Sequence, residues 1–262
     1  MAFALAATPS FAGPGDAGSR EAQTATPLPP ARPLDLPGAR EAPAKPSDEP
    51  VPPASTSPGT PVQNPPTAAS RASDNCLAAL GAVTGTRVKP APIGAQADAA
   101  CQVEQPVVVE ALGLQGTPGT SVRLDPPPVL ACAMARAVAH WLDASAAPLA
   151  RGSFGVELTS LRVGGGLECR RRNRAATGPL SEHATGKALD IAGFRIGSGT
   201  DSREISVAAP RSAAESRFLE GIRQSACGAF ATALGPGSDA AHADHLHVDI
   251  QQRRQAASRF CQ

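Results

Sequence analysis

The segment His242-Ala-Asp-His-Leu-His-Val-Asp-Ile250 holds three of the chain's five histidines and two aspartates in nine residues. Its polar and apolar side chains alternate from His245 onward, a pattern typical of a short β-strand. On such a strand His245, His247 and Asp249 share one face, and three apolar side chains share the other. Imidazole and carboxylate groups on one face stabilise a core poorly but bind metal ions well. The segment therefore predicts a strand that carries part of a metal site.

A second segment with the same side-chain chemistry runs from Ser181 to Asp190, with the sequence Ser-Glu-His-Ala-Thr-Gly-Lys-Ala-Leu-Asp. His183 and Asp190 are seven residues apart, so an unbroken strand would place them on opposite faces. Gly186 interrupts the segment, and a turn there allows His183 to return beside Asp190 at the start of a strand. Two histidines and an aspartate, with one coordination position open, form the ligand set of a catalytic zinc site. The sequence contains no HExxH motif, which excludes that type of zinc helix.

The rest of the chain divides into a proline-rich arm and one domain. Of the 27 prolines, 16 fall within the first 72 residues. Residues 13–72 have too few bulky apolar side chains to offset the entropy of ordering, which predicts a disordered linker. Residues 1–12 resemble the end of a signal peptide, although the basic start of such a peptide is missing. Residues 73–262 are numerous enough to form one domain with its own core.

Net charge and cysteine content bear on the compartment and the partners. The net charge of +1 does not favour binding to nucleic acid. No stretch approaches the roughly 20 apolar residues of a membrane span. The even number of cysteines predicts three disulfides and export to the periplasm or cell envelope, although fifteen pairings are possible and six buried thiols are the alternative. None is in a CxxC pair, so a structural zinc ribbon is disfavoured. The six cysteines are Cys76, Cys101, Cys132, Cys169, Cys227 and Cys261.

Periodicity predicts the remaining elements and the fold class. A strand is expected within Cys101–Val109, and another ends at Gly164–Gly166. Helices are expected over Val129–Leu142, which follows three prolines, and over Ala213–Leu234. Helices segregated from short strands indicate an α+β fold. The prediction is a single domain in which a small antiparallel sheet bears the zinc site, flanked by helices and stapled by disulfides.

These motifs resemble those of known zinc proteins. The pattern Ser181-x-His183-x-x-Gly186-x-Ala188-x-Asp190 with His245-x-His247 is similar to a metallopeptidase group that contains D-alanyl-D-alanine carboxypeptidases, murein endopeptidases and the hedgehog-type zinc fold. A closer resemblance, over roughly residues 74–262, is to the extensin-like C-terminal domain family of bacteria. The further motifs that carry it are Cys101-x-Val-x-x-Pro-Val107, Pro127-Pro-x-Leu-x-Cys132 through Trp141-Leu142, Cys169-Arg-x-Arg-Asn173, Leu234-Gly-Pro-Gly-Ser-Asp-Ala-Ala-His242 and the terminal Cys261.

The resemblance implies roles for individual residues. It implies that His183, Asp190 and His247 bind Zn²⁺. It also implies that Asp244, three residues before the last ligand, or His245 transfers the proton, and it leaves open which of the two does so.

Other residues of the motifs are expected to support this reaction. An arginine, Arg170 or Arg172, would contact the substrate carbonyl, although arginines in this run are also typical of a solvated basic face. His242, Asp249 and Ser181 are expected to surround and orient the ligating groups.

Two functions are compatible with these features. The first is an exported zinc-dependent peptidase or amidase that hydrolyses peptidoglycan peptides; the ligand set, the expected export and the spacer favour it. The alternative is a non-catalytic, metal-containing module of the cell envelope that binds peptidoglycan, because a ligand set can be kept without hydrolysis.

Overall fold

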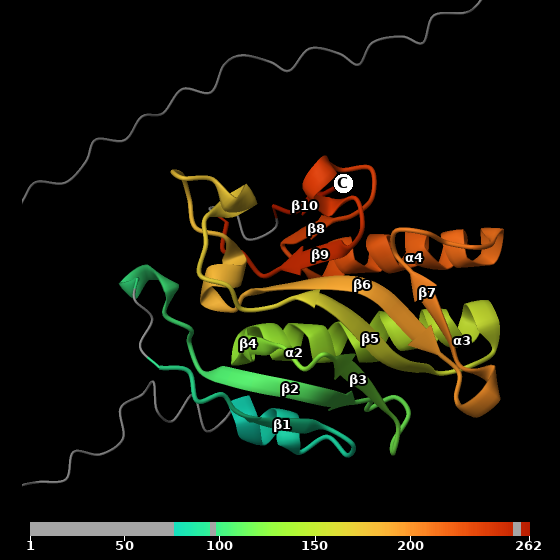
Figure 1. Ribbon diagram of the computed structural model, residues 1–262. Helices are drawn as coiled ribbons and strands as arrows, with labels where there is room; N and C mark the ends of the chain where they lie inside the picture. The colour runs from blue at the N-terminus through green and yellow to red at the C-terminus, as the bar shows by residue number, and fades with distance from the viewer. Residues whose placement is uncertain (1–75, 95–97, 254–257) are drawn as a thin grey trace, which may run out of the picture. The chain divides into compact units, whose positions relative to one another are not determined.

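The computed structural model describes residues 76–94, 98–253 and 258–262. Within them, one β-sheet is covered on one face by helices (Figure 1). The signal-peptide remnant expected at 1–12 and the linker expected at 13–72 lie outside the described residues.

The sheet has ten strands among the described residues. Their order is β1-β2-β3-β5-β6-β9-β8-β10, while β4 pairs with β2 and β7 pairs with β6. The bounds are β1 Arg87–Pro90, β2 Pro106–Gly113, β3 Ser121–Asp125, β4 Val129–Ala131, β5 Leu158–Gly165, β6 Ala188–Ile196, β7 Arg203–Ser206, β8 Thr232–Leu234, β9 Leu246–Asp249 and β10 Phe260–Cys261.

The sheet is larger than expected and is mixed. The expected combination of a sheet, few helices and three disulfides is confirmed. The expectation of an antiparallel sheet is wrong for two pairs, because β3 runs parallel to β5 and β8 runs parallel to β10. The connection from β3 to β5 is long and contains helices, as parallel neighbours require.

The helices of eight residues or more lie together on one face of the sheet (Figure 1). They are α2 (Cys132–Trp141), α3 (Ala147–Phe154) and α4 (Ala213–Ala229). A π-helical turn, η2 (Leu142–Ala146), joins α2 to α3. The remaining helical segments are short: residues 76–81, η1 (Ala99–Cys101), η3 (Arg172–Arg174), η4 (Glu182–Thr185), η5 (Gly199–Asp201) and η6 (Ala240–His242).

The core forms between these helices and the sheet. Trp141 of α2 packs edge-on against Phe194 of β6 and Phe230, which follows α4. Phe194 also meets Phe218 of α4 at an interplanar angle of 90°. The indole nitrogen of Trp141 donates a hydrogen bond of 3.0 Å to Ser225, so this buried polar atom is satisfied.

Both predicted helices have different bounds in the structure. The helix expected at Val129–Leu142 begins at Cys132, because the residues after the prolines pair with β2 as strand β4. The helix expected at Ala213–Leu234 ends at Ala229, and the last three residues form β8 beside β9. In both cases backbone pairing with the sheet took residues that periodicity assigned to a helix.

The six cysteines form three disulfides, as predicted. The pairs are Cys76–Cys132, Cys101–Cys169 and Cys227–Cys261, and no cysteine of the described residues is free. The paired cysteines are 56, 68 and 34 residues apart in the sequence, respectively. Each bridge typically stabilises a domain by about 2–4 kcal/mol. Such bridges are typical of proteins that fold in an oxidising compartment.

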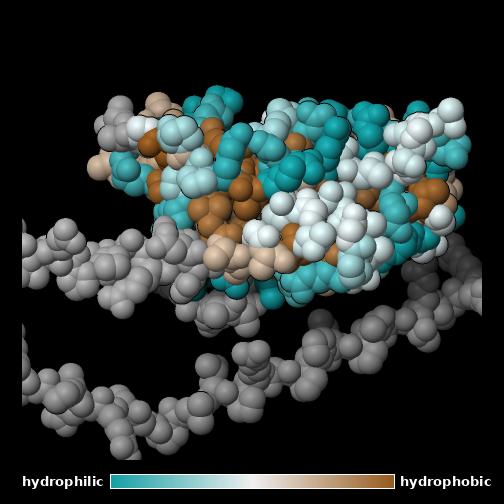
Figure 2. Space-filling view, turned by 90° about the horizontal axis from the view of Figure 1, so that it is seen from below, coloured by the Kyte–Doolittle hydropathy of each residue, from teal (hydrophilic) through white to brown (hydrophobic). Residues whose placement is uncertain are grey.

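The surface of the described residues mixes hydrophobic and hydrophilic groups. On the face shown in Figure 2, the largest hydrophobic group lies left of centre and is bordered by hydrophilic side chains. Among the described residues, Phe260 of β10 is the large hydrophobic residue that is exposed, with 44% of its surface accessible to solvent. None of the described helices has the length and apolar character needed to cross a membrane.

Candidate metal centre

Strands β6 and β9 place Asp190 and His247 opposite each other. The two residues are register partners in the antiparallel pair, so their side chains lie on one face of the sheet. Their strand neighbours Leu189 and Val248 point to the other face and are fully buried in the core. The alternation expected for His247 and Asp249 is confirmed. Strand β9 begins only at Leu246, where its pairing with β6 starts, so His245 precedes the strand and the expected strand start is wrong.

His183 reaches the same place from the short helix η4. The Ser181 hydroxyl caps this helix and accepts a hydrogen bond of 3.3 Å from the His183 backbone nitrogen. Gly186 ends it at a φ of 67°, in the left-handed region. A Cβ at this position would lie 2.7 Å from the Ala131 backbone nitrogen, so only glycine fits. The expected turn at Gly186, which returns His183 beside Asp190, is therefore present.

The donor atoms of three residues converge. His247 Nδ1 lies 2.8 Å and His183 Nε2 lies 3.2 Å from Asp190 Oδ1. The two ring nitrogens are 3.2 Å apart. The three ligand atoms lie within 4.8 Å of one another, close enough to hold a metal ion. These three residues are called the candidate centre below.

Hydrogen bonds behind the two rings fix which nitrogen faces the centre. His183 Nδ1 lies 2.7 Å from the Gly166 carbonyl oxygen, which can only accept, so Nδ1 carries the proton. In the neutral ring, Nε2 then keeps its lone pair toward Asp190. His247 Nε2 lies 3.4 Å from Asp249 Oδ2. Asp249 thus has the orienting contact expected for it, since a group behind a ligating ring fixes its tautomer.

The pKa values of the buried residues in and behind the candidate centre depend strongly on one another. Burial alone lowers the pKa of His247, but hydrogen bonds from its ring to Asp190 and Asp249 outweigh this and raise the pKa to about 9. Burial alone raises the pKa of Asp190, but hydrogen bonds and charge from His183 and His247 hold it well below its usual range. Burial alone raises the pKa of Asp249, but hydrogen bonds from the His247 ring, the Gln251 backbone and the Thr232 side chain lower it overall. A metal ion would therefore have to displace a proton from His247.

His245 and Asp244 form a pair at the edge of the centre. His245 Nε2 lies 3.5 Å from Asp190 Oδ1, and its Nδ1 lies 2.7 Å from Asp244 Oδ1. The Asp244 side chain is 80% exposed, and that of His245 is 17% exposed. Hydrogen bonding to His245 lowers the pKa of Asp244. Of the two residues considered for proton transfer, His245 faces the centre and Asp244 faces solvent behind it.

His242 lies beside the centre without a hydrogen bond to it. Its Nδ1 lies 2.8 Å from Asp239 Oδ1, which also caps η6. Its ring centroid is 5.4 Å from those of His245 and His247. The contact of His242 with the ligating residues expected beside it is therefore packing of its ring against His247.

The candidate centre opens into a cavity of about 500 Å³. Residues 168–174, called the arginine loop, follow β5, and four of them line the cavity: Arg170, Arg172, Asn173 and Arg174. A second group of lining residues, called the C-terminal wall, consists of Thr232, Gln251, Arg253 and Phe260. Both Arg170 and Arg172, expected near a substrate carbonyl, line the cavity.

The arginines of the loop are paired with carboxylates of the chain. Arg170 Nε donates to Glu168 at 2.8 Å, and Arg174 binds the same carboxylate through both of its terminal nitrogens. Arg172 lies 3.7 Å from Glu182. The Glu182 side chain is 19% exposed, and burial is the largest cause of its raised pKa.

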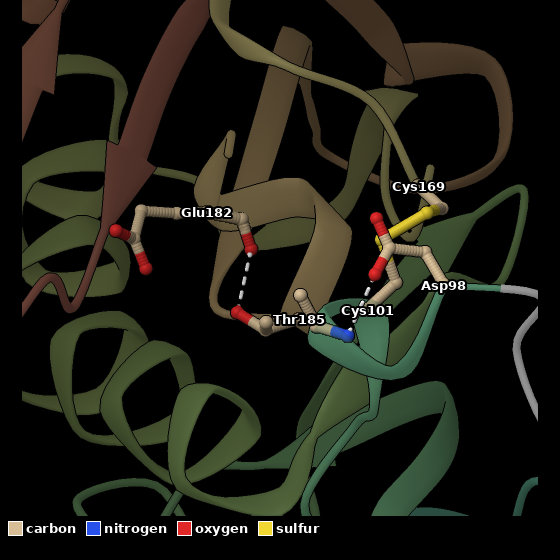
Figure 3. Close-up of a disulfide and its surroundings, with 6 residues drawn as sticks. Asp98, Cys101, Cys169, Glu182 and Thr185 are labelled. Atoms are coloured by element: carbon tan, nitrogen blue, oxygen red, sulfur yellow. Dashed lines mark hydrogen bonds between the residues drawn. A yellow bond between two sulfur atoms is a disulfide. The ribbon is translucent and has the colours of Figure 1, made fainter. Parts of the chain in front are cut away.

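Disulfides hold both the arginine loop and the C-terminal wall. Cys101–Cys169 ties the arginine loop to η1, and Figure 3 shows this bridge next to η4, with the Glu182 side chain directed away from it. Asp98 caps η1 through the Ala100 backbone nitrogen. Cys227–Cys261 ties β10 of the C-terminal wall to α4.

Sequence reasoning missed three contributors to this region. Arg253 and Phe260 follow the histidine segment in a stretch with no motif, so no local pattern singled them out. Gly165 was treated only as the end of a strand, yet a Cβ there would lie 2.8 Å from Asp190 Oδ2. Its position opposite Asp190 in the β5–β6 register could be found only with the pairing known.

Comparisons with known proteins give one match. No curated protein and no solved structure is detectably similar to the chain. The family described as extensin-like protein C-terminus matches residues 74–262, which include every described strand and the whole candidate centre. The resemblance noted from the motifs is thus confirmed for this family, and the chain belongs to the family described as extensin-like protein C-terminus.

Proposed function

We propose that the chain is an exported, zinc-dependent peptidase or amidase that hydrolyses peptides of peptidoglycan. The observation that carries this proposal is the convergence of His183, Asp190 and His247 at a cavity of about 500 Å³, with His245 beside them. Three disulfides support export, and a periplasmic or cell-envelope location belongs to the proposal.

The donor set fits zinc. Two imidazole nitrogens and one carboxylate oxygen leave one position open for a reacting molecule, as in catalytic rather than structural zinc sites. The Gly166 carbonyl and the Asp249 carboxylate supply the outer hydrogen bonds that ligating histidines usually have. All cysteines of the described residues are in disulfides, so sulfur is not available as a ligand.

Each group around the centre has a role in hydrolysis. Zinc held by the three residues would polarise the substrate carbonyl and lower the pKa of water from about 15.7 toward 7. His245 accepts a proton from the attacking water at Nε2 and returns it to the leaving amine. The carbon–nitrogen bond breaks, hydroxyl is added to the acyl carbon, and hydrogen is added to nitrogen. Asp244 holds His245 Nδ1, which keeps Nε2 directed at the centre.

An arginine of the loop would stabilise the charge that develops on the carbonyl oxygen. A single donor in such a position contributes about 3 kcal/mol. Arg170 and Arg172 both line the cavity, and Arg170 is the more buried, with 23% of its side chain exposed against 46% for Arg172. We therefore favour Arg170.

The test is a digestion of defined muropeptides with the full chain. Zinc-loaded protein is incubated with stem peptides that end in D-alanyl-D-alanine, and products are identified by mass spectrometry with and without a chelator. Cleavage that stops with chelator and in His183→Ala supports the proposal. Tight binding of the same peptides without any cleavage would instead support the non-catalytic peptidoglycan-binding module.

A further inference from the structure

Four arginines line the cavity, and one of them has no partner of opposite charge. Arg170 and Arg174 share Glu168, and Arg172 pairs with Glu182. Arg253, on the C-terminal wall, forms no ion pair with any carboxylate of the described residues. Residues 250–262 contain no aspartate or glutamate.

Arg253 is held in place by neutral groups. Its Nη2 donates to Thr232 Oγ1 at 2.9 Å, and its guanidinium carbon lies 5.9 Å from the centroid of the Phe260 ring. Its Nε is buried and has no hydrogen-bond partner among the described residues. A partly buried guanidinium with an unsatisfied nitrogen is costly unless an anion completes its surroundings.

The guanidinium is also connected to the candidate centre. Thr232, which accepts from Arg253, hydrogen bonds Asp249 with its side chain. Asp249 in turn contacts His247. Thr232 is the register partner of Asp249, so the sheet itself fixes this chain of contacts. Arg253 therefore sits at a defined position in the lining of the cavity.

We propose that Arg253, backed by Thr232 and Phe260, is a subsite for a free carboxylate of the peptide close to the bond that is cut. A planar guanidinium binds a carboxylate through two parallel hydrogen bonds, which suits this role better than a lysine would. The loop arginines already form ion pairs with Glu168 and Glu182, whereas Arg253 forms none with the described carboxylates. The inference rests on the proposed function and narrows it to peptides with a free carboxylate, as in removal of a C-terminal residue.

The test compares two probes on the full chain. N-acetyl-D-alanyl-D-alanine carries the free carboxylate, and its C-terminal carboxamide lacks only that charge. Binding is measured by calorimetry on metal-free protein, so that turnover does not interfere. We expect the acid to bind about 10- to 100-fold more tightly than the amide, the range for a hydrogen bond to a charged group. Arg253→Gln should remove this difference.

A matched control is available on the same segment. Arg259→Gln makes the same change in charge, but Arg259 binds the Phe230 carbonyl and does not line the cavity. It should keep the preference for the acid. Equal binding of acid and amide by the wild-type chain, no binding of either probe, or a preference that survives Arg253→Gln would each overturn the subsite.

The two proposals can fail separately. A preference for the acid that depends on Arg253, without cleavage by zinc-loaded protein, would retain the subsite and reject the peptidase. Cleavage of acid and amide at similar rates by wild type and Arg253→Gln would retain the peptidase and reject the subsite.

Discussion

The candidate centre and the pair Asp244–His245 at its edge, called the rim below, contain the same residue types in opposite environments. His183 and His247 are buried, with 2% and 9% exposure, and each has a hydrogen-bond partner on both sides of its ring. At the rim, His245 is held by Asp244, whose side chain is 80% exposed. The buried group is rigid and oriented, which suits the holding of a metal. The rim pair has access to solvent, which suits the exchange of protons.

Removing a residue of the buried group should have the largest effect. We expect His183→Ala to weaken zinc binding by more than about 100-fold, because outer-shell changes alone cost about 10- to 100-fold. Hydrolysis should be lost with the metal. The measurement is metal content after dialysis, by elemental analysis.

A histidine outside the cavity provides the control for this variant. His140→Ala removes an exposed histidine of α2 and should retain full metal content. Equal metal content in His183→Ala and wild type would reject His183 as a ligand.

Changes at the rim should separate turnover from metal binding. His245→Ala should lower turnover by about 10²- to 10⁴-fold, the usual contribution of a positioned proton-transfer group, and keep the zinc. Asp244→Asn should lower turnover less, about tenfold, because an exposed pair contributes little. The measurement is the hydrolysis rate of zinc-loaded variants. A larger loss in Asp244→Asn than in His245→Ala would make the aspartate the base.

A substitution at Gly165, the register partner of Asp190, should shift the Asp190 carboxylate without removing a ligand. In Gly165→Ala the new Cβ would lie 2.8 Å from Asp190 Oδ2, so the carboxylate must move. We expect zinc affinity to fall by about tenfold while the fold is kept.

Gly164 is the matched control, since a Cβ there finds its nearest atom at 3.6 Å. Competition with a chromogenic chelator gives the affinities of both variants. Unchanged affinity in Gly165→Ala would show that the position of Asp190 does not control the metal.

The last prediction concerns pH rather than a substitution. The pKa of His247 is raised to about 9 in the metal-free chain, above its usual value of 6.5. Its contribution to the free energy of unfolding is therefore complete below pH 6.5, declines as pH rises, and is lost above about pH 9. Zinc competes with that proton, so its affinity should rise by about tenfold per pH unit over the same interval.

Denaturant titrations of metal-free protein at several pH values, with parallel zinc titrations, check both trends. Asp249→Asn should flatten them, because Asp249 is one of the two carboxylates that stabilise the charged ring. Trends that run in the opposite direction would show that His247 is neutral in the metal-free chain.

The sequence was informative where chemistry and backbone geometry are local. The turn at Gly186, the shared face of His247 and Asp249, and the presence of three disulfides all follow from residue type and spacing. The strand β4 and the end of α4 could not be predicted in this way, because both depend on partners distant in the sequence. The roles of Gly165 and Arg253 depend on which strands are neighbours, and neither residue belongs to a motif.

The register between β6 and β9 has a consequence for how this protein can change. Sliding β6 by one residue would send Asp190 into the apolar core and bring Leu189 to the cavity. Sliding β9 would exchange His247 and Val248 in the same way. The same alignment that satisfies the hydrophobic core thus spaces the reactive groups. An insertion within either strand would therefore disturb the core and the candidate centre together. The register of β6 with β9 thus fixes the spacing of Asp190 and His247. A change that preserves the packing of the core also preserves this spacing.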